Sequence, residues 1–238
     1  MALQFSSCKQ KYTFLSSLLL LLLLSSSVAE LSFNFYAGSC PGAELIVRNT
    51  VRSASTSDPS VLGKLLRLIF HDCFVQGCDG SVLIRGNGTE RSDPGNASLG
   101  GFTVIESIKN VLEIFCPGTV SCADILVLAA RDAVEALGGP VVPIPTGRRD
   151  GTVSMAENVR PNIIDTDFTV DKMINIFSSK GLSLQDLVVL SGTLCFLIFN
   201  KERDLSLKQI NLENSILRSQ EHTLLELRIA THSTVDLS

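Results

Sequence analysis

The strongest constraint on this chain is the stretch of residues 65–81, where an apolar helical pattern runs into a short loop between two cysteines, Cys73 and Cys78. Arg67 and His71 are four residues apart, so on a helix they lie on one face, one turn apart. This spacing places a permanent cation beside a side chain that can accept a proton near neutral pH. The stretch therefore predicts a buried helix whose last turns carry acid–base chemistry.

Other interpretations of these residues remain open at this point. A single histidine on an apolar helix is most often structural. His71 with Cys73 and Cys78 could bind zinc, but closed zinc sites usually need a second ligand pair at metal spacing, and none is visible in the sequence. A small disulfide-bonded zinc or structural protein is therefore the weakest of the candidate functions.

The full wording of the stretch, LLRLIFHDCFVQGCDGS, closely resembles the distal haem segment of the plant secretory (class III) peroxidases. Similar wording in FYAGSCPGAE and PVVPIPTGRRDG extends this resemblance over residues 30–192, about two thirds of the chain. The resemblance implies the distal half of a haem-peroxidase-like helical fold. It also implies haem b and calcium as cofactors and hydrogen peroxide as a substrate.

The resemblance assigns roles to four distal residues. His71 removes a proton from peroxide, and its ordinary pKa of about 6.5 suits a base near neutral pH. Arg67 stabilises negative charge on the leaving oxygen, because its guanidinium does not lose its proton. Phe70 walls the pocket over the haem face. Asn96 accepts the ring N–H of His71, which leaves the other ring nitrogen basic.

Oxygen-bearing residues directly follow His71 and suit calcium, which takes roughly six to eight oxygen ligands. The calcium set is Asp72, Asp79 and Ser81 through their side chains, Val75 and Gly77 through their carbonyls, and Glu90, which also supports the loop that carries Asn96. The loop closed by Cys73 and Cys78 could preform this shell. A solvated acidic turn is the alternative, and the spacing is not that of an EF-hand.

Two asparagines in the Gly- and Ser-rich loop 85–101 lie in glycosylation sequons, NGT at 87–89 and NAS at 96–98. If Asn96 is buried near His71, only Asn87 is expected to carry a glycan. Further along, Pro161 resembles the proline at the family's substrate edge. The match is looser there, because Arg160 precedes it and the family usually has Leu-Pro closer to the asparagine.

Charge and the N-terminus restrict partners and compartment. The net charge is −4 and no basic stripe exists, which excludes nucleic acid as an expected partner. Lys9 and Lys11 precede an apolar run at 15–24 and small residues at 27–29, so residues 1–29 are predicted to be a signal peptide. The apolar run is shorter than the roughly 20 residues of a membrane span, so an anchor is the weaker alternative. We expect a secreted, extracellular protein, with cell wall or vacuole as destinations and no membrane span in the mature chain.

Six cysteines follow the predicted signal peptide, which suits an oxidising compartment. Sequence alone allows many connectivities, although Cys73 and Cys78 are close enough to close a small loop. The resemblance pairs Cys40 with Cys116. In the family, the counterpart of Cys122 pairs with a cysteine far downstream, and the partners of Cys122 and Cys195 stay open.

Hydrophobic periodicity predicts amphipathic helices joined by loops, so the expected fold class is all-α. Expected helices follow Pro41, run from residue 58 to His71, span 102–115, run from Ser121 to Gly138, end at Gly181, and lie just before Gly192. The predicted N-caps are Asp58, Ser121, Thr166 or Asp167, and Ser183.

The family pattern stops after Gly192. Family members continue with a small residue and then the histidine that ligates haem iron from the proximal side, whereas Leu194 stands at about that position in this chain. His222 and His232 lie within residues 193–238, where no family wording is found. We therefore find no proximal haem ligand. Residues 193–238 are expected to be a divergent, poorly ordered tail that arises from truncation or alternative splicing.

The resemblance as a whole implies a secreted, haem-dependent, monomeric peroxidase that uses hydrogen peroxide to oxidise small phenolic donors. Such an enzyme serves hydrogen peroxide breakdown and the response to oxidative stress. The alternative is an inactive, truncated calcium-binding remnant that lacks the proximal haem ligand.

Overall fold

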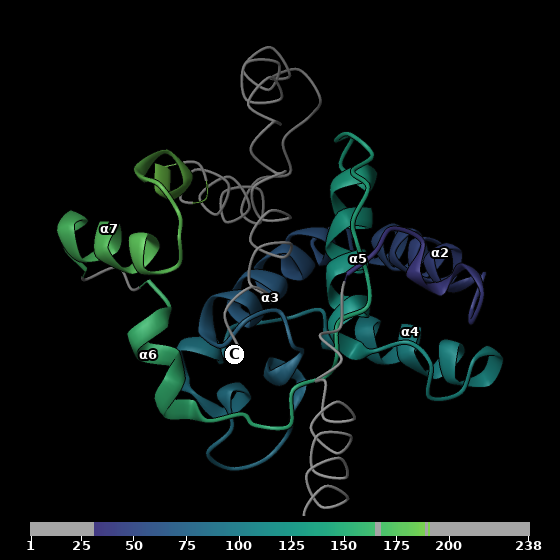
Figure 1. The fold of residues 1–238 in the computed structure, drawn as a ribbon, viewed down its shortest axis with the longest axis horizontal. Coiled ribbons are helices and arrows are strands. Elements are labelled where there is room, and N and C mark those ends of the chain that lie inside the picture. Colours follow the sequence, from purple (N-terminus) through teal and green to yellow (C-terminus); the bar gives the residue numbers. More distant parts are fainter. Residues whose placement is uncertain (1–30, 165–167, 189, 191–238) are drawn as a thin grey trace, which may run out of the picture. The chain divides into compact units, whose positions relative to one another are not determined.

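The computed structural model describes residues 31–164, 168–188 and 190, which form helices and turns joined by loops (Figure 1). The elements are η1 (Phe35–Ala37), α2 (Ala43–Ser57), α3 (Val61–Val75), η2 (Ser81–Leu83), η3 (Glu90–Ser92), η4 (Pro94–Asn96), α4 (Phe102–Phe115), α5 (Cys122–Ala136), η5 (Ala156–Asn158), α6 (Val159–Asn162) and α7 (Val170–Ser179). Residues 184–188 are also helical. Within these ranges, strand-like pairing is limited to an isolated antiparallel bridge between Ser32 and Thr146. The predicted all-α class is confirmed.

Several predictions fall on residues that the structure does not describe. These are the signal peptide at 1–29, the divergent tail at 193–238, and the individual residues Leu194, Cys195, His222 and His232. Across the described ranges, no helix has both the length and the apolar character that crossing a bilayer requires.

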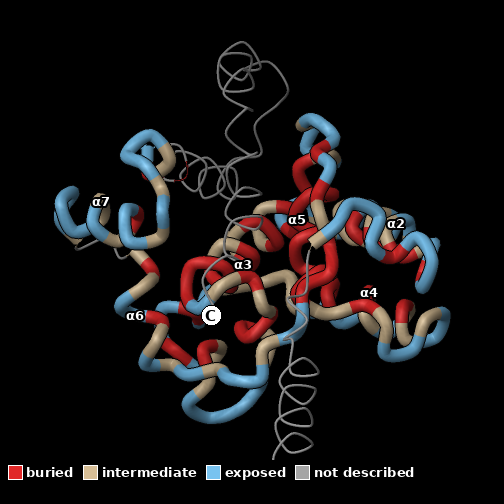
Figure 2. Tube along the Cα trace, in the orientation of Figure 1, coloured by how far each residue is buried: buried red, intermediate tan, exposed pale blue. Residues whose placement is uncertain are grey.

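Helix α5 forms the centre of the core. Every residue from Ala123 to Val134 is buried, and α5 packs against α2, α3 and α4 (Figures 1 and 2). Ala129, Ala130 and Ala133 are small, which suits a helix that has neighbours on several sides. A helix that is apolar nearly all round has to be buried in this way. Its position fixes α3, the helix that carries Arg67 and His71.

The N-terminus of α3 differs from the prediction. Its N-cap is Ser60, and Asp58 instead closes α2, where its backbone N–H donates to the carbonyl of Ala54. The Asp58 carboxylate accepts from the backbone N–H of Ser60 at 3.0 Å and from Lys64 Nζ at 2.6 Å. Asp58 was wrongly predicted as the N-cap because it bonds to a turn residue before the helix rather than to the first helical turn.

The other N-caps give a mixed outcome. The Ser121 hydroxyl accepts from the backbone N–H of Asp124 at 3.1 Å, so this N-cap is confirmed. Ser183 and Asp186 bond reciprocally, also as predicted. Thr166 and Asp167 lie outside the described residues, but the prediction that one of them caps α7 is wrong. Thr169 is the N-cap, and its hydroxyl accepts from the backbone N–H of Lys172.

Candidate active site

Helix α3 places Arg67 and His71 side by side, as their spacing predicts. Arg67 Nε donates to His71 Nε2 across 3.4 Å, a long hydrogen bond. The ring of Phe70 lies edge-on to the imidazole, with ring centroids 5.8 Å apart. Arg67 and Phe70 are half-buried, whereas His71 is 3% exposed. The three side chains thus form one face of the helix, polar at its centre and aromatic at its edge.

A chain of hydrogen bonds fixes the tautomer of His71. Asn96 Nδ2 donates to the backbone carbonyl of Glu90 at 2.9 Å, so Asn96 Oδ1 is left to accept. This oxygen lies 2.7 Å from His71 Nδ1. An acceptor at that position requires the proton on Nδ1, and Nε2 then carries the lone pair that faces Arg67. The predicted arrangement of a basic Nε2 is therefore the one that the geometry favours.

The electrostatics keep His71 neutral. Burial, and to a smaller extent the charge of Arg67, lowers the pKa of His71 from 6.5 to about 4, a shift that the hydrogen bond to Asn96 partly opposes. Burial also lowers the pKa of Arg67, whose guanidinium stays charged because its ordinary pKa is so high. At neutral pH the pair is therefore an uncharged base beside a cation, which can accept a proton and stabilise nearby negative charge.

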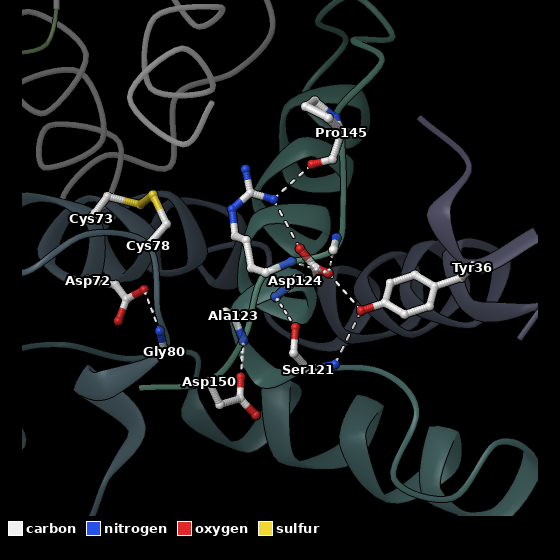
Figure 3. Close-up of polar contacts among 12 residues, drawn as sticks. Tyr36, Asp72, Cys73, Cys78, Gly80, Ser121, Ala123, Asp124, Pro145 and Asp150 are labelled. Atoms are coloured by element: carbon white, nitrogen blue, oxygen red, sulfur yellow. Dashed lines mark hydrogen bonds and ion pairs between the residues drawn. A yellow bond between two sulfur atoms is a disulfide. The ribbon is translucent and has the colours of Figure 1, made fainter. Parts of the chain in front are cut away.

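The loop after His71 is tied down by the Asp72 carboxylate. One Asp72 oxygen accepts from the backbone N–H of Gly80 at 2.9 Å (Figure 3), and the other accepts from that of Val82 at 3.3 Å. Gly80 has φ +75°, and a side chain there would also meet the backbone of Ala123 at 3.2 Å. Asp72 is fully buried, and burial raises its pKa well above the ordinary value. The two backbone hydrogen bonds thus do not fully offset the cost of burying a negatively charged carboxylate.

Two further members of the predicted calcium set have buried oxygens without a hydrogen-bond partner. These atoms are Ser81 Oγ and both carboxylate oxygens of Glu90. Burial raises the pKa of Glu90 to about 7; the nearby Ser81 hydroxyl opposes this shift without meeting hydrogen-bond geometry, and Asp79 adds to it. Unpaired buried oxygens are costly, so a hard cation at this place would satisfy them.

The remaining calcium candidates support the site less directly. Asp79 Oδ1 accepts from the backbone N–H of Ser81 at 3.0 Å, and the Gly77 carbonyl accepts from that of Asp79. Val75 ends α3 and is buried. Among the described residues, no three acidic, histidine or cysteine side chains converge as a metal site. A calcium shell at this loop therefore needs the Ser81 hydroxyl and backbone carbonyls as well as carboxylates, which is the donor set that the resemblance implies.

Comparison with known proteins identifies the family. A family model described as Peroxidase matches residues 47–210, more than half of the chain. This chain belongs to the peroxidase family. It is 95% identical over 192 residues to Peroxidase 18 of Arabidopsis thaliana. The aligned region covers 81% of this chain and 58% of that relative. Peroxidase 46 of the same plant is 74% identical over 180 residues, covering 76% and 55%.

These matches confirm the resemblance to plant class III peroxidases, and their extent is also informative. The chain spans little more than half the length of the curated relatives it matches. Recognisable family sequence stops at Gly192, but the match to the family model continues to residue 210.

Two disulfides join described cysteines of this peroxidase chain. The structure joins Cys40 to Cys116, the pair that the resemblance implies, and Cys73 to Cys78, the pair expected from their closeness in sequence. Cys122 forms no disulfide with any described cysteine, and burial raises its pKa. The second disulfide begins two residues after His71, so it limits where the calcium loop can lie.

Pro161 lies apart from the hydrogen-bonded residues. It is exposed on the short helix α6, which contacts both α3 and η4. A side chain added at Gly95 of η4 would come within 3.7 Å of Val159, which shows how closely α6 approaches the turn that holds Asn96. The structure thus places α6 beside the turn that holds Asn96, and the role of Pro161 at a substrate edge stays a prediction.

Sequence reasoning missed a second buried polar group in this peroxidase chain. Asp124 Oδ2 accepts from Tyr36 Oη at 2.7 Å (Figure 3) and from the backbone N–H of Gly147 at 2.7 Å. Asp124 Oδ1 accepts from Arg148 Nη1 at 3.0 Å. Asp150 then accepts from the backbone N–H of Ala123. The charged segment TGRRDG is recognisable in the sequence, but the sequence could not show which residues this segment contacts, because they are distant along the chain.

Asp93 was also missed, although a local signal existed. Its carboxylate accepts from the backbone N–H of Gly95 at 2.7 Å and caps η4, the turn that ends at Asn96. The dipeptide Asp-Pro followed by Gly is a recognised turn signal. Asp93 therefore shapes the turn that presents the Asn96 amide to His71.

Proposed function

We propose that this chain carries the peroxide-cleaving half of a secreted, haem-dependent peroxidase that uses hydrogen peroxide to oxidise phenolic donors. The observation that carries the proposal is the chain of hydrogen bonds from the Glu90 carbonyl through Asn96 to His71, which leaves Nε2 as a free base beside Arg67. Membership in the peroxidase family supports it. Hydrogen peroxide breakdown during oxidative stress is the role that such chemistry would serve.

His71 would take the proton from the peroxide oxygen that faces it. Positioned general acid–base catalysis of this kind is worth roughly 10²–10⁴-fold in rate. Arg67 would stabilise the negative charge that develops on the other oxygen as the O–O bond breaks. Bound haem b would supply the electrons for that cleavage. Phe70 would cover the distal side of the haem and restrict entry to small molecules.

Calcium would be held by Asp72, Val75, Gly77, Asp79, Ser81 and Glu90 through carboxylate, hydroxyl and carbonyl oxygens. This assignment is supported by the unpaired oxygens of Ser81 and Glu90. The loop leaves α3 directly after His71, so a filled site would stiffen the end of the catalytic helix.

A second candidate function is favoured by the sequence after Gly192. Leu194 stands where the family has its proximal histidine. Without a ligand there, this chain would bind calcium but little haem, and it would lack peroxidase activity. His222 is the alternative donor that this chain could offer, although its surroundings have no family wording.

Haem loading of the whole chain separates the two candidates. The chain is expressed in a secreting host with added haemin, and the purified protein is assayed for Soret absorbance and guaiacol oxidation. Stoichiometric haem with His71-dependent turnover supports the peroxidase. Calcium binding without haem supports the inactive remnant. A high-spin haem spectrum that His222→Ala abolishes would identify His222 as the iron ligand.

The compartment follows from the same proposal. We propose that residues 1–29 direct the chain to the secretory pathway and that Asn87, which is exposed, carries a glycan. The mature protein would act as a monomer outside the cell or in the vacuole. Mass spectrometry of the secreted chain tests both the cleavage site and the modification.

A further inference from the structure

Two sequons nine residues apart behave in opposite ways in the folded chain. Asn87 of NGT is exposed. Asn96 of NAS is 3% exposed, and both of its amide atoms are engaged, Oδ1 with His71 Nδ1 at 2.7 Å and Nδ2 with the Glu90 carbonyl at 2.9 Å. Nδ2 is the atom to which an N-linked glycan attaches. The same atom is therefore a modification target by sequence and a buried donor by structure.

The orientation of the Asn96 amide is set by its neighbours. If the amide were flipped, its oxygen would face the Glu90 carbonyl oxygen, and two acceptors would meet without a hydrogen between them. In the observed orientation, one Nδ2 hydrogen is bonded to Glu90 and the other also lies within the protein. Replacing either hydrogen by a sugar would place a large polar group in the interior next to His71.

We propose that Asn96 is an N-glycosylation site of the unfolded chain alone, and that its modification and the folded site exclude each other. The reaction joins Asn96 Nδ2 to the anomeric carbon of a lipid-pyrophosphate-linked oligosaccharide. The anomeric C–O bond breaks, the lipid pyrophosphate leaves, and Nδ2 loses one proton. The inference rests on the proposed entry into the secretory pathway, where this donor is found, and it is independent of haem.

The order of synthesis leaves Asn96 open to the reaction. The turn that holds it, η4, packs against α6, and α3 packs against α5. Both α5 and α6 follow Asn96 in the chain, so neither has emerged to pack against η4 or α3 when the sequon first becomes accessible. Because N-terminal segments emerge first during synthesis, the asparagine is accessible before the elements that bury it can fold around it. Folding and glycosylation therefore compete for one amide nitrogen.

The first test compares folded and unfolded chains with one glycosylating enzyme. Purified oligosaccharyltransferase and its lipid-linked donor are added to the full folded chain and to the same chain reduced and alkylated at its cysteines. Glycan occupancy is measured by mass spectrometry at both sequons. Asn87 should be modified in both samples, whereas Asn96 should be modified in the alkylated chain and stay unmodified in the folded one.

The second test changes the sequon without touching Asn96. Ser98 is exposed, so Ser98→Ala removes the sequon and Ser98→Thr makes it a better acceptor, and neither alters the Asn96 amide. In a secreting host, Ser98→Ala should raise the yield of secreted chain, and Ser98→Thr should lower it and enrich Asn96-modified chain in the retained fraction. Asn87→Gln serves as the control for glycan loss in general.

Two outcomes would overturn the proposal. One is a glycan on Asn96 in the folded or secreted chain. The other is an Asn96 that stays unmodified in the alkylated chain while Asn87 is modified. Both outcomes are independent of peroxidase activity, so failure of the proposed enzyme function would be recognised separately, by the absence of haem and turnover.

Discussion

Asp124 and Arg148 form a buried ion pair in which Oδ1 and Nη1 lie 3.0 Å apart and the side chains are 0% and 1% exposed. Asp124 lies on the central helix α5, and Arg148 lies in the extended segment that follows it. The Asp124 carboxylate also accepts from Tyr36 and from two backbone N–H groups. The pair therefore links three separate parts of the chain through one carboxylate.

Removing one partner of this pair should be strongly destabilising. Asp124→Asn leaves the Arg148 guanidinium buried without its counter-charge, which we expect to lower the free energy of unfolding by about 3–5 kcal/mol. Urea unfolding of the unchanged chain and of Asp124→Asn measures the difference in free energy. Lys64→Met, which breaks an ion pair between exposed groups, is the matched control and should have a much smaller effect. Equal effects of both substitutions would contradict the prediction.

The His71 imidazole should titrate far below neutral pH. Burial lowers its folded pKa from 6.5 to about 4. As pH falls through this window, the unfolded chain binds the proton first, so the contribution of His71 to stability is present above about pH 6.5 and is lost toward pH 4. NMR titration of the ring, together with urea unfolding at several pH values, measures both quantities.

The variant Asn96→Asp tests the contact between residue 96 and His71 Nδ1. A carboxylate beside Nδ1 favours the imidazolium, so the pKa of His71 should rise. Asn87→Asp adds the same charge at an exposed position and should leave the His71 titration unchanged. A His71 pKa near 6.5 in the unmodified chain would show that the ring is more hydrated than the structure indicates.

Calcium binding should depend on pH through Glu90. Without metal, burial raises the pKa of Glu90 from 4.5 to about 7, so the folded state binds a proton that the unfolded state does not. The metal-free chain should then lose stability as pH rises from about 4.5 through 7. Because calcium needs the deprotonated carboxylate, the rise in melting temperature on adding calcium should be larger at pH 8 than at pH 5.

Two variants separate the parts of this calcium prediction. Glu90→Gln should remove most of the pH dependence, because the titrating group is gone. Asp79→Ala removes a proposed ligand and should make the melting temperature insensitive to chelator at either pH. If calcium titration of the unchanged chain gives neither heat nor a melting shift, the calcium assignment is wrong.

Peroxide cleavage should fail when the distal pair is removed. In a chain extended with the C-terminal part of a full-length family member, His71→Ala should slow the reaction with peroxide by roughly 10²–10⁴-fold. Arg67→Leu should also slow it, because the leaving oxygen loses its stabilising charge. Stopped-flow mixing with hydrogen peroxide gives the rates, and Arg85→Leu, an exposed arginine outside the site, is the control. Unchanged rates in His71→Ala would remove its assigned role.

Local patterns predicted the helices well and their tertiary contacts poorly. The helix over 102–115 was predicted to the residue, because its apolar face and the glycines before it are both local signals. Ser121 was also predicted as an N-cap. The carboxylate of Asp124, three residues further on, bonds to Tyr36 and Arg148, which are 88 and 24 residues away. No local pattern contains such partners.

The residues of the candidate site were predicted partly from helix spacing and partly from the family resemblance. Arg67 and His71 are paired by helix geometry alone, so their spacing is sufficient. The Asn96 contact joins residues 25 apart, and only the family resemblance implied it. The unpaired oxygens of Ser81 and Glu90 could not be predicted at all, because the absence of a partner is a property of the packed structure.

The Cys40–Cys116 disulfide has a consequence for the unfolded chain. It joins residues 76 apart, and the ring that it closes contains Arg67, His71, Asn96 and the whole calcium loop. Closing a ring of this size restricts the entropy of the unfolded chain by about 4–5 kcal/mol at room temperature in the polymer model. These residues of the proposed site therefore all lie between the two bonded cysteines. The disulfide keeps them close together in the unfolded chain, so they need to search less space to meet again on refolding.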